Sequence, residues 1–132
     1  MYGAILGDII GSPFEFDRGN KTKEFDLFTK GCDFTDDSVM TIAVGEALLA
    51  VGAEATVKEI EEALVTNMQD WGKRYPYAGY GGRFRYWLRE SNPKPYGSYG
   101  NGSAMRVSAA GWLYDSLERT REVARATANV TH

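Results

Sequence analysis

The sequence lacks several features that mark common classes of protein. Its single cysteine, Cys32, cannot form a disulfide within the chain, which indicates a reducing compartment. It has no apolar run of the roughly 18 residues that a membrane span requires. Asp8 interrupts the apolar N-terminal stretch, which also lacks the basic region of a signal peptide. With a net charge of −3, the chain has no basic excess to bind nucleic acid or an anionic membrane. We therefore expect a cytoplasmic protein with no nucleic-acid or membrane partner.

The alternation of apolar and polar residues that is typical of strands is also missing, whereas helical spacing is common. The clearest helix follows residues 34–38, and its apolar face is made by Val39, Met40, Ala43, Val44, Ala47, Leu48 and Val51. Gly52 suits the end of this helix. A capping box formed by Thr56 and Glu59 then begins a second helix, whose apolar stripe continues to Trp71.

Shorter helices complete the pattern, and the chain length of 132 residues suits one domain. We expect these helices over residues 2–11, 79–90, 103–114 and 116–129. Residues 17–34 are polar and irregular, and residues 92–102 form a loop rich in glycine and proline. In the aromatic-rich segment between these regions, Phe84, Trp87 and Leu88 are expected to face inward. The sequence therefore predicts a single all-α domain over residues 1–132.

The motif FTDDS, residues 34–38, places a hydroxyl and two adjacent carboxylates at the start of the clearest helix. Thr35 can cap the helix, and Asp36 and Asp37 in the first turn favour the positive end of its dipole. The same oxygen atoms are the hard ligands that Mg²⁺, Mn²⁺ or Ca²⁺ prefer, and a cation would relieve the repulsion between the two carboxylates. Capping and metal binding both remain open at this point.

The first predicted helix carries glycines at residues 3, 7 and 11, spaced four apart on one face. A glycine within a helix costs about 1 kcal/mol relative to alanine, so we expect another backbone to approach this face closely. Beyond this helix, Glu15 lies between Phe14 and Phe16. Its carboxylate is either partly desolvated, with a raised pKa, or exposed to solvent from a loop.

A glycine-rich loop, GNGSAMR at residues 100–106, leads into the helix predicted from Ser103. Exposed backbone N–H groups and the helix dipole at such a position suit a phosphate group. Arg106 either assists this binding or is a solvated surface charge. His132 is the only histidine, and its place at the end of the sequence predicts a frayed, inert side chain.

Taken together, these motifs resemble the ADP-ribosylglycohydrolase family in both wording and order. The family begins with a GAxxGDxxGxPxEF-type helix, and this chain has GAILGDIIGSPFEF at residues 3–16. An F/YTDDT/S motif follows in the family, as at residues 34–38, and then a GNG-type loop, as at residues 100–106. The chain ends with Thr131 and His132, which match the start of a T-H-x-H-P-type stretch.

The resemblance implies a compact orthogonal bundle of helices that hydrolyses the bond between ADP-ribose and a protein side chain. Thr35, Asp36 and Asp37 would be ligands of a binuclear Mg²⁺ or Mn²⁺ site, and Glu15 would be the catalytic carboxylate. By the same resemblance, ADP-ribose or an ADP-ribosylated protein would be bound by Asn101, Gly102, Ser103 and His132.

The chain departs from the family pattern in its length. Family members are about twice as long, and their later GGDTDT-type motif, which supplies the remaining metal ligands, is missing here. The resemblance therefore implies an N-terminal half that carries about half of an active site, with a missing C-terminal half or self-association completing it. Two alternatives remain: a non-catalytic structural or ADP-ribose-binding helical module, and a hydrolase that acts on a different ADP-ribose-like substrate.

Overall fold

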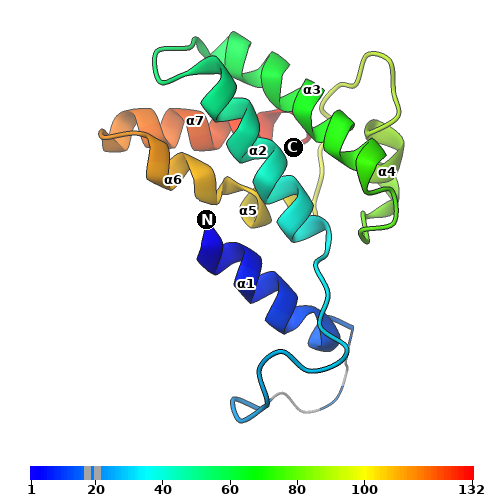
Figure 1. The fold of residues 1–132 in the computed structure, drawn as a ribbon. Helices are drawn as coiled ribbons and strands as arrows, with labels where there is room; N and C mark the ends of the chain where they lie inside the picture. Colours follow the sequence, from blue (N-terminus) through cyan, green and yellow to red (C-terminus); the bar gives the residue numbers. More distant parts are fainter. Residues whose placement is uncertain (17–18, 20–21) are drawn as a thin grey trace.

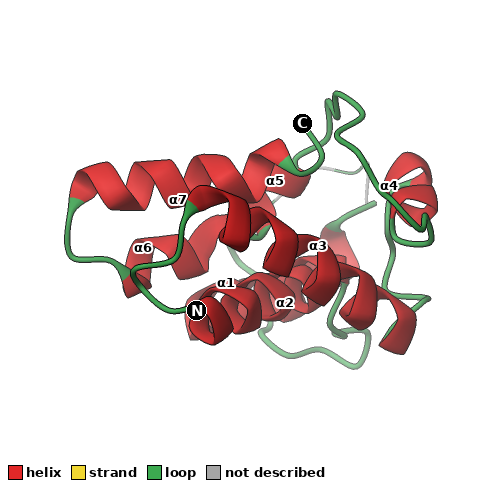
Figure 2. Cartoon of the chain, turned by 90° about the horizontal axis from the view of Figure 1, so that it is seen from above, coloured by secondary structure: helices red, strands yellow, loops and turns green. Residues whose placement is uncertain are grey.

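The computed structural model describes residues 1–16, 19 and 22–132, which form helices and loops and no strand (Figure 2). The helices are α1 (Tyr2–Gly11), η1 (Ser12–Phe14), α2 (Asp36–Val51), α3 (Val57–Arg74), α4 (Gly82–Trp87), α5 (Gly102–Met105), η2 (Val107–Ala109), α6 (Ala110–Leu113) and α7 (Leu117–Asn129). The predicted all-α class is confirmed. No helix in these described ranges has the length and apolar character needed to cross a membrane.

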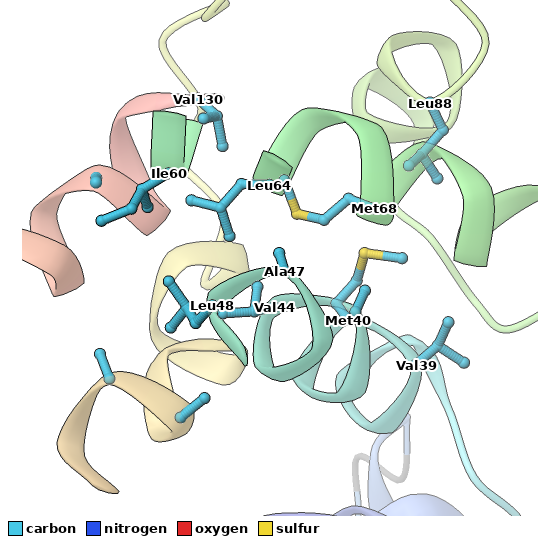
Figure 3. Packing of buried hydrophobic residues seen from close by; sticks show 14 of the residues in the cluster. Val39, Met40, Val44, Ala47, Leu48, Ile60, Leu64, Met68, Leu88 and Val130 are labelled. Carbon is cyan, nitrogen blue, oxygen red and sulfur yellow. The ribbon is translucent and has the colours of Figure 1, made fainter. Parts of the chain in front are cut away.

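Helix α2 lies at the centre of the core, between α3 on one side and α1 and the α5–α6 segment on the other (Figure 1). Six of the seven residues predicted for its apolar face are buried, and Val51 is partly buried. Side chains of α2 and α3 interdigitate along this interface, as Figure 3 shows for Met40, Val44, Ala47, Leu64 and Met68. The burial of one continuous stripe from each helix explains why the sequence periodicity located both of them.

Three predicted helix starts are confirmed at the level of hydrogen bonds. The Thr35 hydroxyl accepts a hydrogen bond from the backbone N–H of Asp37, and Thr56 and Glu59 form the reciprocal capping box. The Ser116 hydroxyl accepts from the N–H of Arg119 at the start of α7. Each side chain satisfies a backbone donor that would otherwise lack a partner in the first turn.

Helix α1 lies at the periphery of the molecule, against the N-terminal part of α2 (Figure 1), and it contains no buried residue. We expected another backbone to pack closely on Gly3, Gly7 and Gly11, and this expectation is wrong for the described residues. No neighbouring atom of these residues lies within 4 Å of a Cβ built on any of the three glycines. The apolar sequence of α1 therefore forms a helix face that no other described residue covers. The irregular segment predicted over residues 17–34 includes residues outside the described ones, and its described part, residues 19 and 22–34, contains no helix.

The helix predicted over residues 79–90 is shorter in the structure, where α4 spans Gly82–Trp87. Phe84, Trp87 and the following Leu88 are buried, as predicted. The helix predicted over residues 103–114 is instead divided into α5, η2 and α6. The division falls at Arg106, whose backbone φ and ψ of −101° and 0° end α5 and whose side chain is buried. Because α5 has four residues, the expectation of a long helix dipole behind the glycine-rich loop is wrong.

Candidate active site

Asp8 of α1 ties the start of α2 to the neighbouring helix. One of its carboxylate oxygens accepts hydrogen bonds from the backbone N–H groups of Thr35 (2.8 Å) and Ser38 (3.1 Å). The other accepts from the Thr35 hydroxyl at 2.6 Å. A negative charge at this position also complements the positive end of the helix dipole. The FTDDS motif is therefore capped twice, by its own Thr35 and by a carboxylate from a different helix.

Carboxylates gather around this helix start. The pKa of Asp36 is raised to about 6, first by partial burial and then by the charges of Asp37, Glu15 and Asp8, although a backbone hydrogen bond opposes the rise. Partial burial and the charge of Asp8 also raise the pKa of Asp37, while its hydrogen bonds with Thr35 and its own backbone N–H lower it. The structure thus assembles like charges at one helix end, an arrangement that a bound cation would stabilise.

Glu15 lies beyond α1 and takes part in the same electrostatic cluster. Its side chain is exposed, which agrees with the solvent-facing alternative. Partial desolvation nevertheless raises the pKa of Glu15, and the charges of Asp37 and Asp8 raise it further, in the direction that the desolvation alternative predicted. Glu15 is therefore a solvent-accessible carboxylate with increased proton affinity, beside the acidic start of α2.

The donor set at the start of α2 has the chemistry of a divalent-cation site but is incomplete. The Thr35 hydroxyl donates its hydrogen to Asp8 and accepts from the N–H of Asp37, which leaves one lone pair of its oxygen available. With Asp36 and Asp37 it offers the hard oxygen ligands that Mg²⁺ or Mn²⁺ takes. Among the described residues, however, no three carboxylate, histidine or cysteine side chains are grouped closely enough to hold a metal.

A pocket of about 320 Å³ lies next to this acidic end of α2. Asp36 forms part of its wall, and facing it are the start of α4, the glycine-rich loop and the end of the chain. The lining residues include Asp36, Gly81, Gly82, Arg83, Phe84, Tyr96, Ser98, Tyr99, Gly100, Asn101, Gly102, Met105, Arg106, Thr131 and His132. Segments about 65 and 95 residues apart in sequence therefore meet around one concavity that has a carboxylate at one edge.

Behind Asp36 lies a glycine that the backbone requires. Gly79 has a φ of +107°, a conformation that L-residues rarely adopt. A Cβ built on it would lie 3.4 Å from Oδ1 of Asp36. Tyr80 follows directly and is buried, and its pKa is raised to about 12, first by burial and then by the charge of Asp36. The turn before α4 therefore encloses one side of the Asp36 carboxylate.

The structure brings together many of the residues predicted for the site. Asp36, Asn101, Gly102 and His132 all line the pocket. Ser103 is partly buried in α5 and does not line the pocket. The remaining predicted residues, Glu15, Thr35 and Asp37, interact with Asp36 or Asp8 at the start of α2. Of the two alternatives for Arg106, the solvated surface charge is wrong, because the side chain is buried. The expected fraying of His132 is also wrong, because both of its ring nitrogens are hydrogen-bonded.

Sequence reasoning missed the capping role of Asp8, although the isolated charge in an apolar helix signalled an unusual position. Its partners lie 27 and 30 residues further along the chain, beyond the reach of helical periodicity. The pocket-lining role of Arg83 was also missed. Its guanidinium donates a hydrogen bond to the Tyr96 carbonyl at 2.7 Å and lies over the ring of the same tyrosine.

Comparison with known proteins gives consistent matches along the chain. The family model described as ADP-ribosylglycohydrolase matches residues 1–132. The chain is 31% identical over 161 aligned positions to ADP-ribosylhydrolase ARH3 of Homo sapiens, covering 100% of this chain and 43% of that protein. The ARH3 proteins of Xenopus tropicalis and Gallus gallus are 29% and 26% identical, again over 100% of this chain and 43% of their own length. No solved structure gives a significant match.

Proposed function

The chain belongs to the ADP-ribosylglycohydrolase family, and from this premise we propose that it supplies about half of a hydrolase active site. The proposed reaction is metal-dependent hydrolysis of the glycosidic bond that links ADP-ribose to a protein side chain. The observation that carries the proposal is the shared pocket, in which Asp36 of the acidic helix start faces Asn101, Gly102 and His132. The chain spans 43% of the length of the relatives it matches, which supports a partial site.

The acidic start of α2 is the proposed metal half-site. Thr35, Asp36 and Asp37 would hold Mg²⁺ or Mn²⁺, and the complete site would be binuclear, with the other protein ligands outside this chain. When bound, such ions supply Lewis acidity and orient the substrate. The raised pKa values of Asp36 and Asp37 support this assignment, because partial burial and then repulsion among the carboxylates disfavour their ionised forms, and a bound cation would compensate both effects.

Glu15 is the proposed catalytic carboxylate. It would accept a proton from a water molecule as the water oxygen bonds to the anomeric carbon and the bond to the protein side chain breaks. Its raised pKa supports the role, since a base works best when its pKa approaches the working pH. The loop residues Asn101, Gly102 and Ser103, with His132, would bind the ADP-ribose moiety and hold the anomeric carbon in place.

A second candidate function has its own supporting observation. The described residues contain no metal-binding group of three or more His, Cys, Asp or Glu side chains, whereas a pocket of about 320 Å³ lies beside the start of α2. A non-catalytic module that binds ADP-ribose without chemistry would need only the pocket. A hydrolase for a different ADP-ribosyl compound is a variant of the first proposal, and product analysis with a panel of ADP-ribosyl compounds separates the two.

The test of the proposed function uses the longest reading frame that contains this chain. Release of free ADP-ribose from an ADP-ribosylated protein is measured with and without a chelator, and we expect the chelator to abolish it. Glu15→Gln should lower turnover by about 10²- to 10⁴-fold with ligand affinity retained, because an amide cannot accept the proton. The matched control is Glu54→Gln, an exposed glutamate outside the pocket, which should leave turnover unchanged.

The 132-residue chain by itself supplies the complementary test. Calorimetry should show weak Mg²⁺ or Mn²⁺ binding that Asp36→Ala removes, and ADP-ribose release should be absent or at a trace rate. Tight metal binding or robust chelator-sensitive turnover by this chain would contradict the half-site. Binding of ADP-ribose without any turnover in the longer protein would favour the non-catalytic module.

A further inference from the structure

Arg106 is a buried cation without an acidic partner. Its side chain is 1% exposed, and no salt bridge to it is found among the described residues. The guanidinium instead donates to the backbone carbonyl of Thr127, from Nη2 at 2.7 Å and from Nε at 3.3 Å. Burial lowers the pKa of Arg106 to about 10, so it remains charged at neutral pH. A buried charge held by neutral acceptors is costly, which calls for a specific role.

The remaining hydrogen bonds of Arg106 lead to the pocket. Nη2 also donates to the Thr131 hydroxyl oxygen at 2.8 Å, and this oxygen lies 2.9 Å from Nδ1 of His132. On the far side of the imidazole, Nε2 lies 3.1 Å from the carbonyl oxygen of Gly100. The guanidinium also lies directly beneath the loop, because a Cβ built on Gly102 would be 3.5 Å from Nη1.

The chemistry of these groups determines the direction of each hydrogen bond. The Gly100 carbonyl can only accept, so Nε2 of His132 must carry a proton. In the neutral ring Nδ1 is then an acceptor, and the Thr131 hydroxyl must donate to it. The Thr131 oxygen uses a lone pair to accept the hydrogen bond from Arg106. The hydroxyl hydrogen of Thr131 is then available to Nδ1 of His132, which is closer than the Ala128 carbonyl at 3.4 Å.

The same turn is attached to the pocket wall by its backbone. The Thr131 carbonyl accepts hydrogen bonds from the N–H groups of Tyr96 and Ser98, each at 3.2 Å. Thr131 is itself fully buried. Residues 96–100 are therefore held against residues 131–132 by two backbone hydrogen bonds and by the His132 side chain. Thr131 takes part in or adjoins each of these contacts, and its hydroxyl is bound by Arg106.

We propose that Arg106 is a positioning residue: through the Thr131 hydroxyl it fixes His132 in the Nε2–H form on the Gly100 carbonyl and so holds the glycine-rich wall of the pocket. Arg106 acts through its neighbours and needs no contact with a ligand. The link to ADP-ribose affinity rests on the proposed function, whereas the hydrogen-bonded chain from Arg106 to Gly100 does not.

The first experiment observes the imidazole directly. His132 is the only histidine, so a long-range ¹H–¹⁵N spectrum of the labelled chain at about pH 8.5 reports this ring alone. We expect a protonated Nε2 and a hydrogen-bonded, unprotonated Nδ1. Thr131→Val should shift Nδ1 to the value of a free acceptor nitrogen and speed exchange of the Nε2 proton by about tenfold, the effect of losing one hydrogen bond.

Matched variants separate positioning from general stability. Thr127→Val removes a buried hydroxyl from α7, just before the turn that carries Thr131, but that hydroxyl donates to the Ala124 carbonyl and has no part in the chain to His132. It should leave both nitrogen signals unchanged. Arg106→Met should reproduce the Thr131→Val spectrum, and Arg106→Lys should restore part of the wild-type spectrum. If Arg106→Met does not fold, the comparison of Thr131→Val with Thr127→Val decides.

The second arm titrates ADP-ribose into the same samples. Thr131→Val should weaken its binding by about three- to tenfold, and Thr127→Val should not. A wild-type ring with the proton on Nδ1, or a Thr131→Val spectrum identical to wild type, would overturn the positioning role. Wild-type spectra as expected without any ADP-ribose binding would retain the positioning role and overturn the assignment of Asn101, Gly102, Ser103 and His132 to ADP-ribose binding.

Discussion

At the residue scale, the acidic start of α2 makes folding depend on pH. The pKa of Asp36 is raised from 3.8 to about 6, first by partial burial and then by the charge of Asp37. Glu15, Asp8 and the buried Tyr80 also face it. Because the folded state binds this proton more tightly than the unfolded chain, ionisation of Asp36 destabilises the fold. The penalty is absent below about pH 4, grows between about pH 4 and 6 and is complete above that range.

Asp36→Asn should therefore stabilise the metal-free protein at neutral pH. In the presence of a chelator at about pH 7.5, we expect the free energy of unfolding to increase by about 1–2 kcal/mol, a value reduced for partial solvent exposure. The difference should vanish below about pH 4, where Asp36 is protonated. Urea unfolding at both pH values measures it, with the exposed Asp26→Asn as control. A variant that is less stable than wild type at the higher pH would contradict the repulsion described here.

At the same scale, sequence patterns located residues that the structure brings together, but they did not predict the surroundings of those residues. Thr35, Asp36 and Asp37 could be found because a cap and an acidic first turn are local patterns. The burial of Arg106 could not be predicted, because it depends on acceptors 21 and 25 residues away in α7 and the turn that follows it. The ordered His132 has a similar cause, since its Nε2 contact with the Gly100 carbonyl depends on the folded position of the loop.

At the scale of elements, Asp8 holds two helices together, and its loss should be measurable. Asp8→Ala removes three hydrogen bonds from the start of α2 and leaves the backbone N–H groups of Thr35 and Ser38 without that acceptor. We expect a loss of about 2–3 kcal/mol in the free energy of unfolding, as for hydrogen bonds to a charged group. Chemical denaturation measures the loss. Asp26→Ala, which changes an exposed carboxylate, should have no effect, and equal stability of the two variants would contradict the capping role.

The helices themselves were largely predictable, and the exceptions have one cause. Helices α2, α3 and α7 carry local caps and a regular apolar stripe, so their starts follow from the sequence. The division of residues 102–113 into short helices did not follow, because the backbone at Arg106 adjusts to bury a side chain whose partners lie elsewhere. Tertiary hydrogen bonds overrode local helix propensity at that point.

At the scale of the whole molecule, the side formed by α1 and the loop after it exposes large apolar side chains. On α1, Tyr2 and Leu6 are 86% and 45% exposed, and beyond it Phe16 is 83% exposed. Leu27 and Phe28 of the following loop are also exposed. Exposed apolar patches of this kind mark contact surfaces. The chain spans 43% of its relatives' length, so self-association or a further segment are the two candidate occupants.

We therefore predict that the 132-residue chain self-associates through this side. Sedimentation velocity over a range of concentrations should show dimers or larger species, and Tyr2→Ser with Leu6→Gln should shift the distribution toward monomer. Leu117→Gln, which changes an exposed leucine on α7, is the control and should have no effect. A compact monomer at high concentration would count against the prediction.

The peripheral place of α1 has a consequence for the order in which the protein assembles. Every residue of the buried apolar core lies between Val39 and Val130, so α1 adds nothing to a folding nucleus formed there. We expect this first helix in the sequence to dock late, through the Asp8 carboxylate and the packing of Met1 against the core. Local opening of α1 would withdraw Asp8 and Glu15 together while α2 and α3 stay packed. Hydrogen exchange in α1 would then follow this partial opening and not global unfolding.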